Sequence, residues 1–387
     1  MKLFVKILGL ALCAAVAGFL IFVPGIVEDN RNAVTPHVPF PVSAQAQALH
    51  DELIIGDWHA DTLMWRRSLL DHSDRGHVDL PRLIAGNVAL QMFTAVTKSP
   101  AGQNYDGNSA DASDSITTLV VAQLWPPRTW NSLLERAMHQ AKRLHDYADA
   151  SNGQLRVIKT RADLETLLSD RAAGQIVVGG LLGIEGAHAL EGDIANLDKL
   201  MAAGHRMIAL QHFFDNALGG SLHGEGDHGL TDFGRQVVAD VEARGLILDL
   251  AHSSQQVARD VLEITDMPIV VSHTGIFSVC PVKRNFPDHL MQAIAAKGGV
   301  IAIGYWADVI CDDSPSGVAA TIKAAVDLLG EDHVSLGSDF DGAVTTGFDV
   351  SQLASLTHAL LETGLTEAQI TKIMGGNMIR VLRARLR

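Results

Sequence analysis

Residues 246–252 read LILDLAH, residues 269–274 read IVVSHT, and the segment between them has apolar residues at helical spacing from Val257 to Ile264. Both apolar runs are short and end in a polar residue, which is typical of buried strands in a parallel sheet. A strand, a helix and a second strand in this order form a βαβ unit. This stretch therefore predicts an α/β fold.

The same pattern recurs along the chain. Six further apolar runs begin at Leu53, Val88, Ile176, Met207, Val300 and Val334. Helical patterns cover residues 133–147, 197–203, 233–243, 290–296 and 318–329, and two more helices begin near residues 350 and 366. Eight parallel strands are the number that closes a barrel. We predict a (β/α)8 TIM-type barrel with extra C-terminal helices, and a long loop over its mouth at residues 97–130.

The amino-terminal segment predicts the cellular compartment of the protein. Lys2 and Lys6 precede an uncharged segment, residues 7–27, and Glu28 and Asp29 follow it. This segment is long enough to span a bilayer, and the charges favour an uncleaved signal anchor (residues 1–27) whose amino end is cytoplasmic. Residues 28–46 are expected to be a linker, and residues 47–387 the barrel domain on the periplasmic or cell-surface side. Secretion after signal cleavage is the alternative.

Composition excludes several classes of protein. The 387 residues carry a formal charge of −14 and no basic cluster, so nucleic acid is not an expected partner. Three cysteines are too few for a disulfide scaffold or a four-cysteine zinc site. Outside the cytoplasm, Cys280 and Cys311 are candidates for a disulfide, because Cys13 lies in the membrane segment. Two separate buried thiols are the alternative.

Polar side chains occur where the predicted strands end. In a barrel, the carboxyl ends of all strands meet at one face, where the chemistry takes place. The polar residues at these ends are His59, Asp61, Gln91, Glu185, His212, His252, His273, Tyr305, Asp339 and Asp341.

Five of these residues predict a metal site. His59 and Asp61 are two positions apart on one strand, so both side chains face one side. If these two residues and Glu185, His252 and His273 were all structural, each would need a separate explanation. One binuclear metal site explains all five at once. Imidazole and carboxylate ligands without thiolate favour Zn2+ over Mn, Fe or Co. Two such ions activate water and polarise a carbonyl, which predicts hydrolysis of an amide, ester or phosphoester.

Other residues have candidate roles in that chemistry. Asp339 is placed to move a proton, with a metal ligand or a turn residue as the alternative. Asp341 precedes Gly342 and is more typical of a turn. His212 is a candidate donor to the developing oxyanion, or a buried structural histidine. Arg284 follows the seventh strand and is a candidate clamp for a substrate carboxylate.

Taken together, the ordered motifs resemble the renal, or membrane, dipeptidases of the amidohydrolase superfamily, from about residue 50 to about residue 385. The motifs are HAD from His59, GHVDLPRL from Gly76, GIEGAH around Glu185, LQHF around His212, LTDFGRQVV from Leu230, LDLAHSS around His252, SHTGIFSVCPVKRNFPD from Ser272 and GSDFDG around Asp339. The segment DWHADTL departs from the animal enzymes at Trp58 and Ala60, which leaves the side-chain preference open.

The resemblance implies a zinc-dependent dipeptidase with two ions per chain. One ion is expected on His59, Asp61 and Glu185, and the other on Glu185, His252 and His273, so that Glu185 and a water or hydroxide bridge them.

The resemblance also assigns substrate contacts. Arg284 is expected at the dipeptide carboxylate, Asp339 as the proton shuttle, and His212 and Tyr305 as further contacts. It further implies a Cys280–Cys311 disulfide, tolerance of a D-residue at the carboxyl-terminal position, and a homodimer.

Two other functions are compatible with the residues alone. One is hydrolysis of another small substrate, such as an N-acyl amino acid, a lactone or a β-lactam. The other is a metal-stabilised binding protein without turnover.

Overall fold

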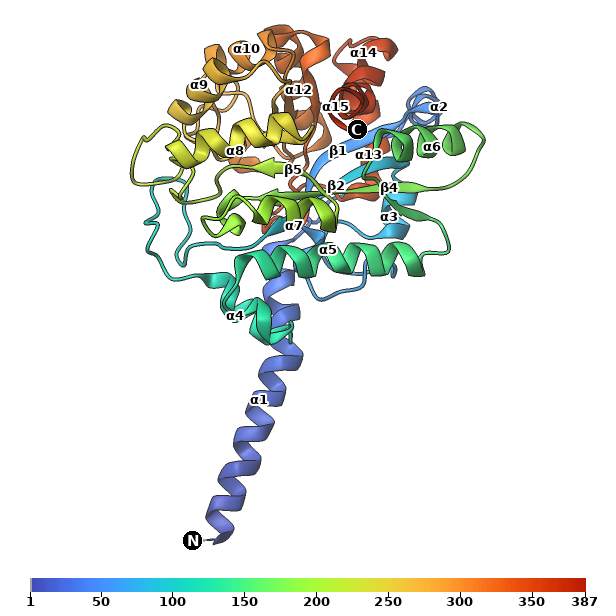
Figure 1. Ribbon diagram of the computed structural model, residues 1–387. Helices are drawn as coiled ribbons and strands as arrows, with labels where there is room; N and C mark the ends of the chain where they lie inside the picture. The colour runs from blue at the N-terminus through green and yellow to red at the C-terminus, as the bar shows by residue number, and fades with distance from the viewer. Residues whose placement is uncertain (1) are drawn as a thin grey trace.

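A closed barrel of parallel strands forms the centre of the computed structural model, which describes residues 2–387 (Figure 1). Neighbouring strands pair in the order β2-β1-β9-β8-β7-β6-β5-β4, and β2 pairs with β4 to close the ring. The strands are β1 Ile55–Ala60, β2 Val88–Val96, β4 Val178–Glu185, β5 His205–Ala209, β6 Ile247–Asp249, β7 Val270–Thr274, β8 Val300–Ile303 and β9 Val334–Leu336. The eight predicted strands and the (β/α)8 barrel are confirmed.

Helices surround the barrel. They are α1 Lys2–Arg31, α2 Ala44–Glu52, α3 Leu80–Ala85, α4 Ser115–Ala122, α5 Leu133–Ala150, α6 Arg161–Ala172, α7 Asn196–Ala203, α8 Asp232–Ala243, α9 Gln255–Ile264, α10 Asp288–Ala296, α11 Ala307–Ile310, α12 Pro315–Leu329, α13 Leu353–Glu362, α14 Glu367–Thr371 and α15 Asn377–Arg385. The predicted helix start at Thr366 is confirmed, because its hydroxyl accepts from the Gln369 amide and caps α14.

Several elements lie outside the predicted pattern, the short helices α2, α3 and α11 among them. The short strand β3 (Leu155–Val157) pairs with β4 and is too short to give a period. Helix α6 follows it, and Thr160 and Asp163 form its capping box. Within residues 97–130, the Asp114 carboxylate caps α4, so part of the expected loop is helical.

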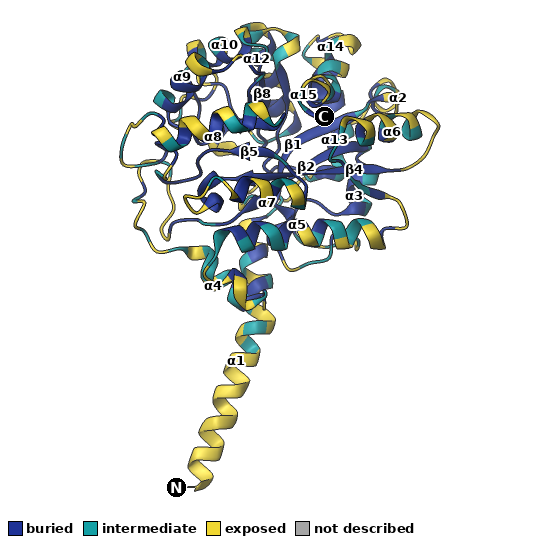
Figure 2. Ribbon diagram, in the orientation of Figure 1, coloured by how far each residue is buried: buried dark blue, intermediate teal, exposed yellow. Residues whose placement is uncertain are grey.

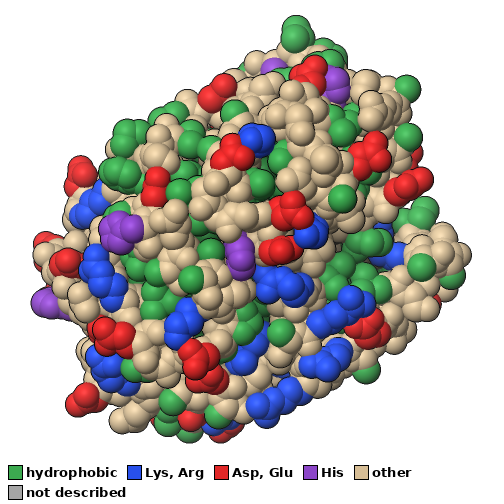
Figure 3. Space-filling model, turned by 90° about the horizontal axis from the view of Figure 1, so that it is seen from above, with side chains coloured by type: hydrophobic (Ala, Val, Ile, Leu, Met, Phe, Trp, Pro, Cys, Tyr) green, Lys and Arg blue, Asp and Glu red, His purple; other side chains and the backbone are tan. Residues whose placement is uncertain are grey.

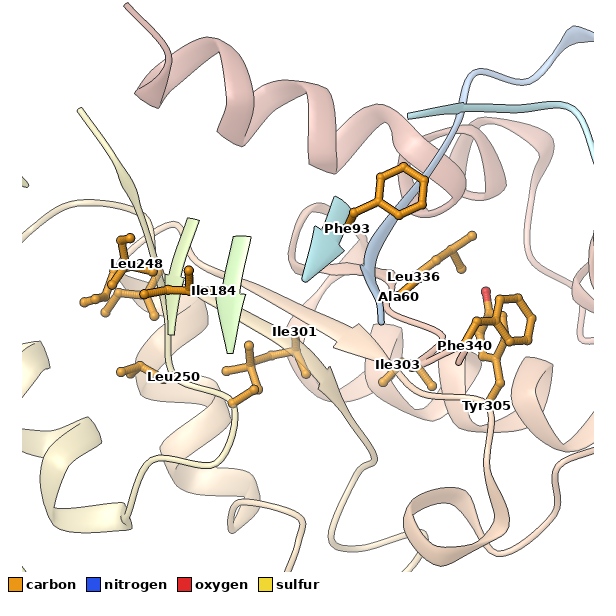
Figure 4. Packing of buried hydrophobic residues seen from close by; sticks show 14 of the residues in the cluster. Ala60, Phe93, Ile184, Leu248, Leu250, Ile301, Ile303, Tyr305, Leu336 and Phe340 are labelled. Carbon is orange, nitrogen blue, oxygen red and sulfur yellow. The ribbon is translucent and has the colours of Figure 1, made fainter. Parts of the chain in front are cut away.

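The two faces of the strands pack into two apolar clusters, as a period of two requires. Met92, Leu181 and Ile247 belong to one cluster, whereas their neighbours Phe93 and Leu182 belong to the other, larger one. Figure 4 shows members of the larger cluster along the strands. Buried residues therefore concentrate in the strands and on the inner faces of the helices, which fixes the strand ends rigidly (Figure 2).

Helix α1 projects from the barrel beside α4 (Figures 1 and 2). In residues 2–387 it is the one helix long and apolar enough to cross a membrane, and most of it is exposed. Its last turns pack on the barrel: Pro24 and Glu28 are buried, and Glu28 Oε1 lies 2.9 Å from Arg67 Nε. The predicted apolar amino-terminal helix is confirmed, and it continues into the barrel surface as far as Arg31.

Candidate active site

The structure brings the predicted metal-binding residues together at the carboxyl ends of the strands. His59 is the penultimate residue of β1, Asp61 directly follows that strand, Glu185 ends β4, His252 lies three residues past β6, and His273 lies within β7. All five side chains are buried. Their convergence follows from the parallel barrel, in which these four strand ends open on one small space.

Glu185 lies at the middle of this group. Its Oε1 is 3.1 Å from His252 Nε2 and 3.5 Å from the Nε2 atoms of both His59 and His273. Its Oε2 is 3.5 Å from His212 Nε2. One carboxylate is therefore surrounded by four imidazole nitrogens.

The group fits metal ions. His59, Asp61 and Glu185 present one ligand atom each within a small sphere, and so do Glu185, His212 and His252, and His59, His273 and Asp339. A tetrahedral ion with bonds of about 2.1 Å holds its ligand atoms about 3.4 Å apart, close to the separations around Glu185. His59 Nε2 has no hydrogen-bond partner within residues 2–387 although it is buried, which fits a nitrogen aimed at an ion.

Neighbouring hydroxyl groups orient these ligands. Ser272 Oγ lies 3.1 Å from His59 Nδ1 and 2.8 Å from His273 Nδ1, so both rings present Nε2 to the centre. Thr94 Oγ1 donates to Asp61 Oδ1 over 2.5 Å. Such outer contacts fix the ligand geometry of metal sites. Sequence patterns missed Ser272 and Thr94 because neither residue type marks a metal site.

The backbone is unusual at the same residues. His252 and Asp339 have positive φ values of 64° and 60°. Positive φ is disfavoured for residues with a Cβ and occurs preferentially at functional sites. Gly186 follows Glu185 at φ 87°, and a Cβ there would lie 2.1 Å from His188 Cε1. A side chain at position 186 would therefore displace the turn that carries Glu185.

Burial and the closeness of several acids shift the pKa values of the side chains in this group. Burial raises the pKa of Glu185 well above its ordinary value, and Asp61 adds to the rise. Burial likewise raises the pKa of Asp339 to about 8, although His59 opposes the rise. Burial lowers the pKa of His252 and His273 well below the ordinary value, and the Arg284 and His59 charges contribute. Burial opposes a charge on His59, but Glu185 and Asp61 outweigh it and raise the pKa of His59 to about 10. The acids thus draw a positive charge into the group, which a metal cation can supply in place of the proton.

A cavity opens on this group. Asp61, Glu185, His212, His252, Arg284 and Asp339 line its polar side. The apolar side is lined by Met64, Trp65, Val96, Ile116, Leu119, Phe213 and Trp306, and Tyr105 closes it with its hydroxyl 3.1 Å from Trp306 Nε1. Tyr105, Phe213 and Trp306 were absent from the predicted site. Only the fold brings Tyr105 and its 97–130 segment over the mouth, whereas Phe213 and Trp306 directly follow the predicted residues His212 and Tyr305 and carried no chemical signal of their own.

Arg284 is a buried cation at this cavity. Its Nη2 donates to the His273 carbonyl oxygen over 2.8 Å, and its guanidinium lies 5.9 Å from the centre of the Trp306 ring. Within residues 2–387 its Nε has no hydrogen-bond partner. A buried guanidinium with free donors fits a carboxylate ligand. The Cys280–Cys311 disulfide, a confirmed prediction, ties the loop that carries Arg284 to α11.

Tyr305 and Asp341 differ from the residues above. The cavity lining does not include Tyr305, whose buried ring packs on Phe340 (Figure 4) and also on Phe348. Asp341 touches the cavity edge, but its carboxylate accepts from Thr62 Oγ1 and the His77 amide, 2.7 Å each, and pairs with Arg67. The hydrogen-bonding capacity of this carboxylate is used within the protein, where it links the segments around the cavity mouth.

Comparisons with known proteins point to a single family. Residues 43–386 match the family model described as membrane dipeptidase, peptidase family M19. Dipeptidase tcpJ of Claviceps purpurea is 30% identical over 322 residues, which cover 80% of this chain and 69% of that protein. Dipeptidase aclJ of Aspergillus oryzae is 28% identical over 347 residues, which cover 84% and 76%.

Two solved structures share the fold. A dipeptidase AC, a metallopeptidase of family M19, is 25% identical with a TM-score of 0.71, and the match covers 86% of this chain and 99% of that one. A metallopeptidase from Rhodobacter sphaeroides, solved with a phosphinate mimic of the dipeptide L-Ala-D-Ala, is 26% identical with a TM-score of 0.70 and the same coverage.

Proposed function

This chain belongs to the membrane dipeptidase family, peptidase family M19, and we propose that it hydrolyses the peptide bond of free dipeptides at a binuclear zinc centre. The family makes it a metallo-dipeptidase, and the observation that carries the finer proposal is Glu185. One buried carboxylate surrounded by four imidazole nitrogens is a ligand shared by two cations.

The protein supplies ligands for two ions. His59, Asp61 and Glu185 would hold one, and Glu185, His252 and His273 the other. When bound, such a pair lowers the pKa of a water molecule and polarises the scissile carbonyl. The protein holds this centre in place, since all five side chains are buried and Ser272 orients two of the rings.

Asp339 would move the proton. Its Oδ1 lies 3.8 Å from His59 Nε2, and its carboxylate faces the cavity. A carboxylate in this place takes a proton from the attacking water and delivers it to the leaving nitrogen. His212, fixed by the contact of its Nδ1 with the Lys98 carbonyl oxygen at 3.1 Å, would stabilise the negative charge that develops on the carbonyl oxygen.

Arg284 would bind the free carboxylate of the dipeptide. Its unpaired Nε is buried beside the metal ligands, so a carboxylate in the cavity gains a charge-assisted bond there. This clamp would select dipeptides over longer peptides, which continue past that position. The Rhodobacter sphaeroides relative was solved with a mimic of L-Ala-D-Ala, and we extend acceptance of a D-residue at the carboxyl-terminal position to this chain.

Helix α1 would anchor the enzyme, with the barrel outside the cytoplasm. Two observations support this side. Lys2 and Lys6 precede the apolar segment, as cytoplasmic flanks do. The Cys280–Cys311 disulfide persists only in an oxidising compartment.

The first test is hydrolysis of L-L, L-D and D-L dipeptides and their carboxamides by the full chain in detergent. Chelation should abolish cleavage, and zinc should restore it with two ions bound per chain. Cleavage of L-L and L-D dipeptides but not of their amides is the expected result. Two bound ions without dipeptide cleavage would contradict the proposal and assign the site to another small amide, a lactone or a β-lactam.

Arg284→Ala tests the carboxylate clamp. It should raise KM for dipeptides by about 10–100-fold, the cost of a charge-assisted bond of about 1.5–3 kcal/mol, with metal content unchanged. Lys283→Ala is the matched control, because this neighbouring cation bonds the exposed Asp106 backbone and does not line the cavity. An unchanged KM in Arg284→Ala would contradict the clamp.

A further inference from the structure

Helix α1 leaves the barrel next to the mouth of the cavity. Val27, near its end, packs on the apolar cluster of Met64, Trp65, Val96, Val120 and Trp125. Three members of this cluster, Met64, Trp65 and Val96, also line the cavity. The apolar wall of the cavity and the base of the helix therefore belong to one packed unit.

An apolar surface continues from this unit. We call it the α4 patch and define it as Ile116, Leu119, Leu124 and Trp130. Ile116 and Leu119 pack on the same cluster as Val27, Leu124 is 61% exposed, and Trp130 is 37% exposed. The Trp130 indole nitrogen donates to the Trp125 carbonyl oxygen over 3.1 Å, which holds the ring beside the cluster. Exposed leucine and tryptophan together are typical of surfaces that contact another phase.

The length of α1 places the patch at bilayer level. Pro24 is buried in the barrel, so residues 3–23 remain to cross a membrane. They rise about 32 Å at 1.5 Å per residue, which matches a hydrocarbon core of about 30 Å. The barrel reaches down to this segment, because Arg66 Nη1 donates to the Leu20 carbonyl oxygen over 2.9 Å. This bond lies about one turn from the barrel end of the segment, a depth at which an arginine side chain can extend to lipid phosphates.

Few charged side chains lie around the α4 patch. Between residues 115 and 134, Arg128 is the one charged residue, and its Nε pairs with Glu135 Oε2 at 2.7 Å. The face turned away from α1 carries both basic and acidic side chains (Figure 3). Such a mixed surface is typical of contact with water.

We propose that the α4 patch lies in the headgroup layer of the bilayer that α1 crosses, so that the catalytic mouth faces the membrane. This inference rests on the anchor proposed above and adds an orientation to it. A single helix alone would leave the barrel free to tilt, whereas a second contact at the α4 patch fixes it. Dipeptides then reach Arg284 and the metal ligands from the water layer next to the lipid.

The test compares two exposed positions in the full chain, reconstituted in vesicles of phosphatidylcholine and phosphatidylglycerol. Cys13→Ser removes the free thiol, and Leu124→Cys or Ile176→Cys accepts an environment-sensitive fluorophore. Ile176 is the matched control, because it is 63% exposed and precedes β4, at the opposite end of the strands. Lipids with a nitroxide near the top of the acyl chain report contact.

A blue shift and quenching of the label at position 124, without either at position 176, is the expected result. Equal spectra at the two positions in vesicle-bound protein would overturn the proposal and leave the anchor intact. Protection at position 124 that appears only at high protein density would assign the patch to a second copy, which also overturns it. Protein that does not float with the vesicles refutes both anchor and orientation, and dipeptide hydrolysis by the same sample tests the catalytic proposal separately.

Discussion

Glu185 and Asp341 are two buried carboxylates at the same end of the barrel, and their surroundings are opposite. Asp341 receives bonds from Thr62, the His77 amide and Arg67, so its pKa falls below the ordinary value although burial alone would raise it. Glu185 faces imidazole nitrogens and the acid Asp61, and its pKa rises.

The comparison distinguishes a carboxylate that stabilises the fold from one that is available for chemistry. The charge of Asp341 is balanced within the protein, so this carboxylate stabilises the fold. Glu185 lies among further acids, since Asp61 and Asp339 add to the rise of its pKa on burial, and buried acids in excess of their counter-charges are costly unless a cation joins them. Four predictions test this contrast.

The largest effect is expected for Glu185→Gln. Losing a ligand shared by two ions should lower activity by more than the ~10–100-fold that a single outer-shell contact of a metal site costs. The metal-free variant should be at least as resistant to urea as the metal-free parent, because the buried charge is gone. Metal analysis, kinetics and urea unfolding check this. A variant that keeps two ions would show that Glu185 does not bridge.

Asp339→Asn should separate proton transfer from metal binding. We expect kcat to fall about 10²–10⁴-fold, the usual share of a general acid–base group, with two ions still bound and KM little changed. Kinetics and metal analysis on the same preparation check both expectations. Loss of an ion would instead make Asp339 a ligand alongside His59 and His273.

Asp341→Asn should act on stability. It takes one of two acids from the buried Arg67, which keeps Glu28 Oε1 at 2.9 Å. The cost should therefore lie below the about 3–5 kcal/mol of unfolding free energy for a buried charge left without a partner, measured by urea denaturation, while metal affinity stays. The triple variant Glu28→Gln, Arg67→Met, Asp341→Asn removes the whole charge cluster and should regain part of the loss. Equal losses in the single and triple variants would contradict the ion-pair explanation.

The smallest effect concerns His205, which is fully buried at the start of β5 and far along the strand from the metal ligands. Burial lowers its pKa from 6.5 to about 4. Between these values the unfolded chain binds a proton that the native state does not, so stability falls as the pH drops, by at most about 1.4 kcal/mol per pH unit.

His205→Asn should remove this slope. Its amide nitrogen can replace the ring nitrogen that lies 3.1 Å from the Gly183 carbonyl oxygen. Urea unfolding of metal-free parent and variant at pH 7, 6 and 5 isolates the difference from metal loss. Parallel pH profiles would show that folding does not lower the pKa of His205.

Much of the site follows from sequence because of one rule. Strand ends of a parallel barrel meet, so polar residues that stop apolar runs predict the cluster of His59, Asp61, Glu185, His252 and His273 without any distance. Each apolar run can be recognised from its own residues, and a closed parallel barrel is the fold that buries all eight runs together. The same reasoning ranked Tyr305 with them, but its ring packs on Phe340 while Tyr105 faces the cavity.

The apolar runs and the polar residues that end them were enough to predict the barrel, the residues that converge at its mouth and the apolar helix before it. The fold was needed to show that Asp341 pairs with Arg67 while Asp339, two residues away, faces the cavity, and that Tyr105 and α1 reach the mouth. The physical reason is that charge balance and contact depend on partners far apart in the chain, such as His77 and Asp341. These partners meet only when the chain packs, so the local sequence around either residue does not predict the contact.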